Sequence, residues 1–243
     1  TFQDGTINDT PGTSSLNFNT TGTVNFIGSN FNSSITGNAS RIHFSGGVFN
    51  NLIDVENNSS GSGSGIGGCV FNDNVKITNS GTGYFLMGNG SPDIFNGNLE
   101  LINTSSSRFR IAYNSVGTEI NGELIVSNVG GGIWFGENGG TTVLANSKTI
   151  SIGTGGFSSG EFRLQNFTQL GTTSQNISLT GTAILRFKGS TAFNGNVNFD
   201  SPRVFIEGTT FNGSIDIEKT GVSSDASTGG NTFVGNTIIR NSG

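Results

Sequence analysis

The fold is decided by a stretch that reads FNGNVNFDSPRVFIEGTTFNGSIDI, residues 193–217. Two units begin here, at Phe193 and Phe211, and each has a phenylalanine, then Asn-Gly, then a hydrophobic-polar-hydrophobic triplet. A second triplet, Val204-Phe205-Ile206, lies between them. Because side chains alternate across a strand, each triplet predicts a short, half-buried β-strand. Three short sides within 18 residues are typical of one coil of a parallel β-helix.

The same unit recurs along the chain. Its starts are 18 to 26 residues apart and fall at or near residues 31, 49, 71, 95, 120, 144, 170, 193, 211 and 233. A longer repeat encloses them, because residues 31–81 align without a gap on residues 193–243, with 18 identities in 51 positions. Self-similarity of this kind indicates a stacked architecture. We therefore interpret residues 1–243 as one continuous solenoid with about one and a half copies of a 162-residue unit.

The composition agrees with an all-β solenoid. The chain has 40 Gly but only six Ala and four Lys, so the strongest helix formers are nearly absent. Asn and Gly accept the left-handed backbone angles of tight turns, which a coil with three corners needs every few residues. The predicted fold is a right-handed parallel β-helix of about 10–11 coils, each with three short strands in 18–26 residues.

Phenylalanine supplies most of the predicted interior. Stacked coils would place Phe31, Phe49, Phe71 and Phe95 above one another, and the asparagine after each is expected to form a ladder of side-chain amides. The outward residues of the first triplets are a mixed polar set, as on a solvated face: Asp54, Lys76, Glu100, Ile125, Ser151, Asn198 and Asp216.

The outward residues of the second triplets are of a different kind. Large aromatic residues and arginines, which are enriched at contact surfaces, dominate them. We name this set the second-triplet stripe, and it consists of His43, Phe85, Arg110, Trp134, Arg163, Arg186 and Phe205. Three interpretations stay open for it: stacking from coil to coil, a lateral contact with another protein, or glycan binding.

Charge and motifs argue against several classes of function. The net charge is −5, from 11 basic and 16 acidic side chains, and no basic patch favours nucleic acid or an anionic membrane. The longest run of large apolar residues, Tyr84–Met87, is too short to cross a bilayer. The single cysteine, Cys69, allows no disulfide within the chain, and the sequence has no recognisable metal, cofactor or catalytic motif.

Two alternatives to a structural role are considered. Parallel β-helices also host polysaccharide-binding and polysaccharide-cleaving sites, which would need carboxylates converging on one surface. The best paired acids recur at the 162-residue offset, as Asp54/Glu56 and Asp216/Glu218. Recurrence suits a structural position better than an active site, so we predict no enzyme. Ice binding would need threonine in one register, which we do not find among Thr20-Thr21, Thr141-Thr142 and Thr209-Thr210.

The units that begin at Phe95, Phe193 and Phe233 read FNGN, FNGN and FVGNTIIRNSG. They resemble the tandem repeats of very large secreted bacterial surface proteins, including the repetitive adhesin-like proteins common in Bacteroidota. The resemblance covers the whole chain, with Ile120 and Leu144 standing where the pattern has Phe. It implies an extracellular or cell-surface segment of a filament or adhesin, without catalysis or cofactor.

Both ends of the sequence read as ordinary coils. Leu16-Asn17-Phe18 is a triplet of the usual kind, and the last unit starts with Thr232-Phe233. An uncapped coil exposes strand edges and apolar interior, and such surfaces recruit further strands. We therefore expect the partners to be further copies or adjacent repeats stacked end to end, with surface glycans as an additional possibility.

Overall fold

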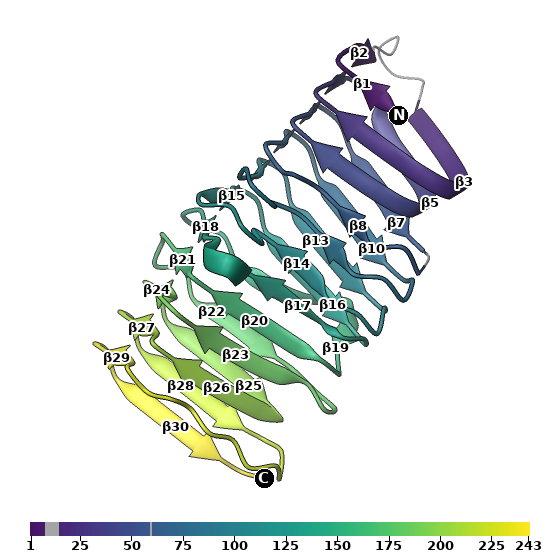
Figure 1. The fold of residues 1–243 in the computed structure, drawn as a ribbon. Coiled ribbons are helices and arrows are strands. Elements are labelled where there is room, and N and C mark those ends of the chain that lie inside the picture. Colours follow the sequence, from purple (N-terminus) through teal and green to yellow (C-terminus); the bar gives the residue numbers. More distant parts are fainter. Residues whose placement is uncertain (8–14, 59) are drawn as a thin grey trace.

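The structure is a computed structural model that describes residues 1–7, 15–58 and 60–243. Strands dominate it, and the one helical segment among these residues is a single 3-10 turn, Glu137–Gly139. The strands wind into coils that stack along one axis, with the two termini at opposite ends (Figure 1). Strands of successive coils pair in parallel. The predicted all-β, parallel β-helix is confirmed.

The first column of strands carries the first triplets. It begins as an eight-stranded sheet of β1 (Phe2–Gln3), β3 (Ser15–Ile27), β5 (Ser34–Ser45), β7 (Ile53–Asn57), β10 (Val75–Asn79), β13 (Leu99–Asn103), β16 (Leu124–Asn128) and β19 (Ile150–Phe157). It continues as a four-stranded sheet of β22 (Gln175–Ser178), β25 (Val197–Ser201), β28 (Ile215–Lys219) and β30 (Thr237–Asn241). The long strands β3 and β5 carry both triplets of their coils.

The other two columns complete each coil. The second is a seven-stranded sheet of β8 (Gly63–Ser64), β11 (Phe85–Leu86), β14 (Phe109–Ile111), β17 (Gly132–Phe135), β20 (Glu161–Gln165), β23 (Ile184–Lys188) and β26 (Arg203–Glu207). The third is an eleven-stranded sheet of β2 (Thr6–Ile7), β4 (Asn30–Phe31), β6 (Val48–Phe49), β9 (Val70–Phe71), β12 (Ile94–Phe95), β15 (Thr118–Ile120), β18 (Thr142–Leu144), β21 (Phe167–Gln169), β24 (Ala192–Phe193), β27 (Thr210–Phe211) and β29 (Thr232–Phe233).

The third column holds the predicted phenylalanine stack. The ring centroids of Phe31, Phe49, Phe71 and Phe95 follow one another at 4.9, 4.8 and 5.0 Å with nearly parallel planes. All four side chains are fully buried. Offset stacking of this kind adds about 0.5–1.5 kcal/mol per pair beyond the burial of area. The predicted interior position of these residues is confirmed.

One start of the repeat was wrong by one residue. The strand pairing places Gln169, not Leu170, opposite Leu144 and Phe193 in this stack. Gln169 is buried because its amide bonds inside the coil, to the carbonyl of Thr173 and the N–H of Gly195. Leu170 is half exposed. Apolar character alone therefore misplaced the register here.

The predicted asparagine ladder runs beside the phenylalanine stack. Each side-chain amide donates to the one in the coil before, at 2.6 to 3.0 Å, through Asn32, Asn50, Asn72, Asn96 and Asn121. The glycine that follows the asparagine is required for a steric reason that the sequence alone did not reveal. A Cβ at Gly97 would lie 2.3 Å from the carbonyl carbon of Asp73 in the coil below, so close stacking excludes a side chain. A left-handed backbone angle is not involved at Gly97.

A second amide ladder lies inside the solenoid. The Nδ2 groups of Asn57, Asn79 and Asn103 donate to the Oδ1 atoms of Asn79, Asn103 and Asn128 at 2.9, 3.1 and 2.8 Å. All four residues are buried, at the ends of β7, β10, β13 and β16. Their amides also bond nearby backbone carbonyls, such as Gly83 and Ser107, which satisfies polar groups that the corner would otherwise bury unpaired.

Candidate functional site

Strand register brings most of the second-triplet stripe together. Arg110, Trp134, Arg163, Arg186 and Phe205 lie directly opposite one another on the successive strands β14, β17, β20, β23 and β26. His43 lies apart from them, half-buried on β5 and opposite Asn25. Burial, and then the charge of Arg41, lower the pKa of the His43 imidazole.

Phe85 does not belong to the stripe. Its side chain is buried in the core, where it lies opposite Gly63 and Phe109, and Leu86 takes the outward position opposite Arg110. A Cβ at Gly63 would be 2.8 Å from the Phe85 ring, so the glycine leaves the space that this ring fills. The predicted orientation of Phe85 was wrong because the partner strand, not the triplet itself, sets it.

The stripe is stacked within the molecule. The guanidinium carbons of Arg108 and Arg163, from the coils on either side, lie 3.7 and 3.4 Å from the ring centroid of Trp134. That of Arg186 lies 4.1 Å from the ring of Phe205. Consequently Trp134 and Phe205 are only 6% and 7% exposed although they point away from the core. Each cation–π pair stabilises by about 0.5–2 kcal/mol.

Carboxylates complete this stacked array. Glu161 accepts two hydrogen bonds from Arg163, at 3.0 and 3.1 Å, and a third from Arg186 at 2.5 Å. Arg186 also donates to Glu207 at 2.9 Å, and Arg203 donates to Asp225 at 2.8 Å. Bidentate pairs with arginine are among the strongest charge-assisted hydrogen bonds. Of the three interpretations, this geometry favours stacking from coil to coil.

The recurring acid pairs of the first column face cations of the next coil. Lys76 forms an ion pair with Asp54 at 3.2 Å. In the second copy, Arg240 pairs with Asp216 at 2.7 Å and with Glu218 at 3.4 Å. Hydrogen bonds from Ser242 and Arg240 lower the pKa of Glu218. Glu56 instead accepts a hydrogen bond from the Ser80 hydroxyl. Partners of this kind within the stack suit a structural role rather than general acid catalysis.

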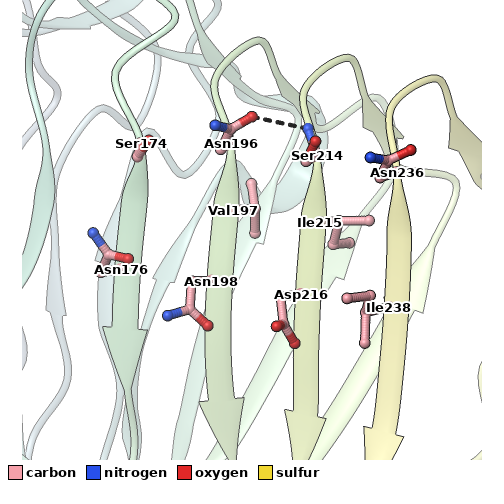
Figure 2. Close-up of a pocket in the computed structure, with 10 residues that line it drawn as sticks. All are labelled: Ser174, Asn176, Asn196, Val197, Asn198, Ser214, Ile215, Asp216, Asn236 and Ile238. Carbon is pink, nitrogen blue, oxygen red and sulfur yellow. Dashed lines mark hydrogen bonds between the residues drawn. The ribbon is translucent and has the colours of Figure 1, made fainter.

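A groove of about 410 Å³ lies on the outer face of the four-stranded sheet, across β22, β25, β28 and β30. Figure 2 shows two rows of outward side chains, a polar row of Ser174, Asn196, Ser214 and Asn236, and a row of Asn176, Asn198 and Asp216 that ends at the apolar Ile238. The Oδ1 atom of Asn196 accepts a hydrogen bond from the Ser214 N–H at 3.0 Å. Alternation in the sequence predicted only Asn198 and Asp216 of these residues as outward-facing, and as part of a solvated face. We name this site the amide groove.

The first copy has a different surface at the equivalent place. A smaller hollow of about 250 Å³ there is lined by Leu52, Asp54, Asn74, Val75, Lys76, Asn98, Glu100 and Ile125. Thr36 stands where the second copy has Asn198, and Lys76 where it has Ile238. The amide of Asn198 thus corresponds to a hydroxyl in the first copy, and the aliphatic Ile238 corresponds to the cation of an ion pair, so the architecture does not require the amide groove.

One carboxyl is buried at the corner before the third column. Asp93 is 1% exposed, and its Oδ1 accepts the backbone N–H of Cys69 at 3.0 Å. Its backbone N–H in turn is within 3.4 Å of the Thr118 hydroxyl. Burial raises the pKa of Asp93 to about 7 and that of the Cys69 thiol to about 12. Both burial and the raised pKa lower the fraction of thiolate at Cys69.

The threonines do not form an ice-binding array on the third column. Within the described residues its outward row has threonine at Thr6, Thr168, Thr210 and Thr232, but other residues such as Asn30, Glu119 and Ala192 interrupt the series. Contrary to expectation, Thr142 and Thr209 do share a register, two residues before Leu144 and Phe211, but both are buried.

Neither a metal-binding cluster nor a membrane-spanning helix is present among the described residues. No group of three or more His, Cys, Asp or Glu side chains among residues 1–7, 15–58 and 60–243 could hold a metal ion. Within the same ranges, no helix has the length and apolar character to cross a membrane. In comparisons with known proteins, no family model, no curated protein and no solved structure matches this chain.

Proposed function

We propose that this chain is a structural repeat segment of an extracellular bacterial filament or cell-surface adhesin. The observation that carries the proposal is that the two copies keep the phenylalanines that stack, while several residues that face solvent differ, such as Thr36 and Asn198. Phe31, Phe49 and Phe71 correspond to Phe193, Phe211 and Phe233, and both sets stack ring on ring. A repeat maintained for stacking has this pattern, whereas a catalytic site would be unique.

The exposed end of the stack supports a partner of the same kind. Phe233 and Ile239 are 38% and 59% exposed, and they line a hollow of about 390 Å³ beside Val204, Ile206 and Ile217. Their equivalents in the first copy, Phe71 and Ile77, are fully buried because β12 and β13 pair over them. The end face therefore fits a coil like residues 82–107, supplied by an adjacent repeat or by another molecule.

The test is to add that coil. Since Gly243 corresponds to Gly81, residues 82–107 are appended directly after Gly243. In a solenoid, each added coil contributes interface energy to its neighbour. We expect the appended coil to raise the free energy of unfolding and to protect the amides of β30 from hydrogen exchange.

The matched control carries Phe95→Asp and Leu99→Asp within the appended copy. These changes place two charges where rings and aliphatic side chains must stack, so the control should leave β30 unprotected. If both extensions protect β30 equally, or neither does, the end face is not a stacking surface for such a coil and the proposal fails.

A further inference from the structure

We propose that the amide groove binds a neutral, extended glycan that lies along the axis of coil stacking. The proposal deepens the adhesin side of the proposed function and rests on an extracellular setting. It concerns the outer face of β22, β25, β28 and β30, which is separate from the stacking end face at Phe233. The two can therefore be tested independently.

The first observation is that three of the four side-chain amides in the groove have no partner in the described part of the chain. Asn176 and Asn198 lie directly opposite each other on paired strands, yet their side chains form no hydrogen bond with each other or with any other described residue. The Asn236 side chain, in the other row, is also without a partner within the described residues. Elsewhere, asparagines in neighbouring coils bond amide to amide, as in the ladders at Asn72 and Asn79.

The second observation is the chemistry that these groups offer. A side-chain amide presents two N–H donors and an oxygen acceptor, so it can bond two adjacent hydroxyls of a sugar at once. Asn176 and Asn198 offer this pattern on β22 and β25, Asn236 offers it directly before β30, and Ser174 adds a hydroxyl directly before β22. Ile238, which is half exposed, gives the end of the same row an apolar contact surface.

The third observation is the charge of the surroundings. Asp200 and Glu218 lie opposite each other on β25 and β28, close to Asp216, and Arg240 on β30 pairs with Asp216 and Glu218. Three carboxylates thus face one guanidinium. This field repels a polyuronate or a sulfated polymer, so the ligand class is a neutral glycan.

The spacing fixes the length of the ligand. Strands of successive coils lie about 4.8 Å apart, so the groove offers a new set of polar groups at each step along four strands. A single sugar ring can contact only part of this set. Binding should therefore strengthen with chain length, because contacts at successive strands act at high effective concentration.

The experiment measures binding of the whole chain to a panel of neutral and acidic glycans. The neutral probes are glucan, xylan, mannan and galactan oligosaccharides of two to eight units, and the acidic probes are polygalacturonate and alginate oligosaccharides. We expect a neutral series to bind, with affinity rising with length, and the acidic probes not to bind. Binding to acidic probes alone, or to no neutral probe at all, overturns the proposal.

Two variants locate the site. Asn176→Ala combined with Asn198→Ala should weaken binding by at least about tenfold, the usual effect of losing several hydrogen bonds to a ligand. The matched control is Thr36→Ala, which changes the residue equivalent to Asn198 in the first copy and should leave binding unchanged. Asn176 and Asn198 are exposed, so the double variant should keep the melting temperature. Thr36 is partly buried and its hydroxyl bonds the Asn17 amide oxygen, so Thr36→Ala should lower the melting temperature slightly without affecting the groove. Equal binding by the double variant and the control excludes the groove, while the β30 exchange experiment still decides the stacking proposal.

Discussion

Residues 31–81 and residues 193–243 are two copies of one unit whose likeness and difference lie in separate places. Inward apolar positions are alike, since Phe31, Ile35 and Phe49 correspond to Phe193, Val197 and Phe211, all buried. The polar partners differ. Asn57 in the inner ladder becomes Lys219, whose ammonium bonds the Gly221 carbonyl and lies 3.3 Å from the Asn241 oxygen.

The differences compensate one another from coil to coil. Where the first copy has Lys76 opposite Asp54, the second has Ile238 opposite Asp216 and supplies the cation from Arg240, two residues further along the strand. Both copies therefore have the same aspartate, but the cation that pairs with it stands at a different position. Stacking therefore constrains each position through its neighbours in adjacent coils, as expected when each coil contacts only the next.

The largest difference between the copies should appear in the phenylalanine stack. Phe71→Ala removes a fully buried ring that stacks on Phe49 and Phe95 at 4.8 and 5.0 Å, and should cost roughly 3–5 kcal/mol. Phe233→Ala removes the equivalent ring, which is 38% exposed and stacks only on Phe211, and should cost clearly less. Chemical denaturation of both variants measures the contrast, and equal costs would show that the last coil is as well packed as the middle of the stack.

The next contrast concerns the corner acceptors and pH. Asp93 accepts the N–H of Cys69, whereas at the same corner Asn231 accepts the N–H of Thr209 at 2.9 Å. Burial raises the Asp93 pKa from 3.8 to about 7, and the one titratable group that faces it, the Cys69 thiol, stays protonated because its own pKa is raised to about 12. The folded chain thus keeps a proton that the unfolded chain releases above about pH 4.

The sign follows from linkage. The stabilisation is complete below the unfolded pKa and is lost as the pH rises from about 4 to about 7, by a few kcal/mol at about 1.4 kcal/mol per pKa unit. Asp93→Asn, which places at this corner the amide that Asn231 presents at the corner of its own coil, should flatten this part of the stability curve. Urea denaturation between pH 4 and 8 measures it, with Asp54→Asn as an exposed control. An unchanged slope in Asp93→Asn would mean that Asp93 is ionised in the fold.

A third contrast tests the inner ladder. Asn79 accepts from Asn57 and donates to Gly83 and Asn103, so Asn79→Ala leaves buried groups unpaired and should cost about 1–3 kcal/mol. Asn241, its equivalent, accepts only from Lys219 and is exposed, so Asn241→Ala should change stability by less than about 0.5 kcal/mol. Thermal denaturation of the two variants compares their losses of stability. A loss for Asn241→Ala as large as that for Asn79→Ala would indicate that the Asn241 amide already has the buried partners of an inner-ladder residue.

The periodic part of the fold was predictable from sequence because it repeats. The triplets, the phenylalanine stack and the outer asparagine ladder each recur at coil spacing, so their period alone places them. The inner ladder was not predicted, because Asn57 and Asn79 are the last residues of their strands and asparagine at such a position is typical of a turn. Their common place, two residues after the triplet, was a signal that could have been used. The reason for glycine at position 97 was not predicted either, because it depends on how closely the neighbouring coil approaches and not on the local sequence.

The candidate sites were predictable only in part. Alternation placed Trp134 and Arg163 on the outer side of their strands, but not the covering of Trp134 by Arg108, which lies one residue outside a triplet. The amide groove could be found only by comparing the copies column by column. Asn198 and its equivalent Thr36 are both polar, so the hydrophobic-polar pattern is the same in the two copies and does not reveal the difference.

The smallest expected effect concerns the exchanged ion pair. Lys76 and Asp54 are 37% and 43% exposed, so their pair should contribute less than about 1 kcal/mol and should weaken with added salt. Lys76→Ile copies Ile238 and removes the pair. Adding Thr78→Arg copies Arg240, which in the second copy reaches the equivalents of both Asp54 and Glu56, so the double variant should regain the lost stability at low salt. Denaturation at low and high ionic strength, read as a double-mutant cycle, separates the coupling from the single effects. If Thr78→Arg stabilises equally with and without Lys76, the two cations act independently, and the idea that neighbouring coils exchange partners within one surface is wrong.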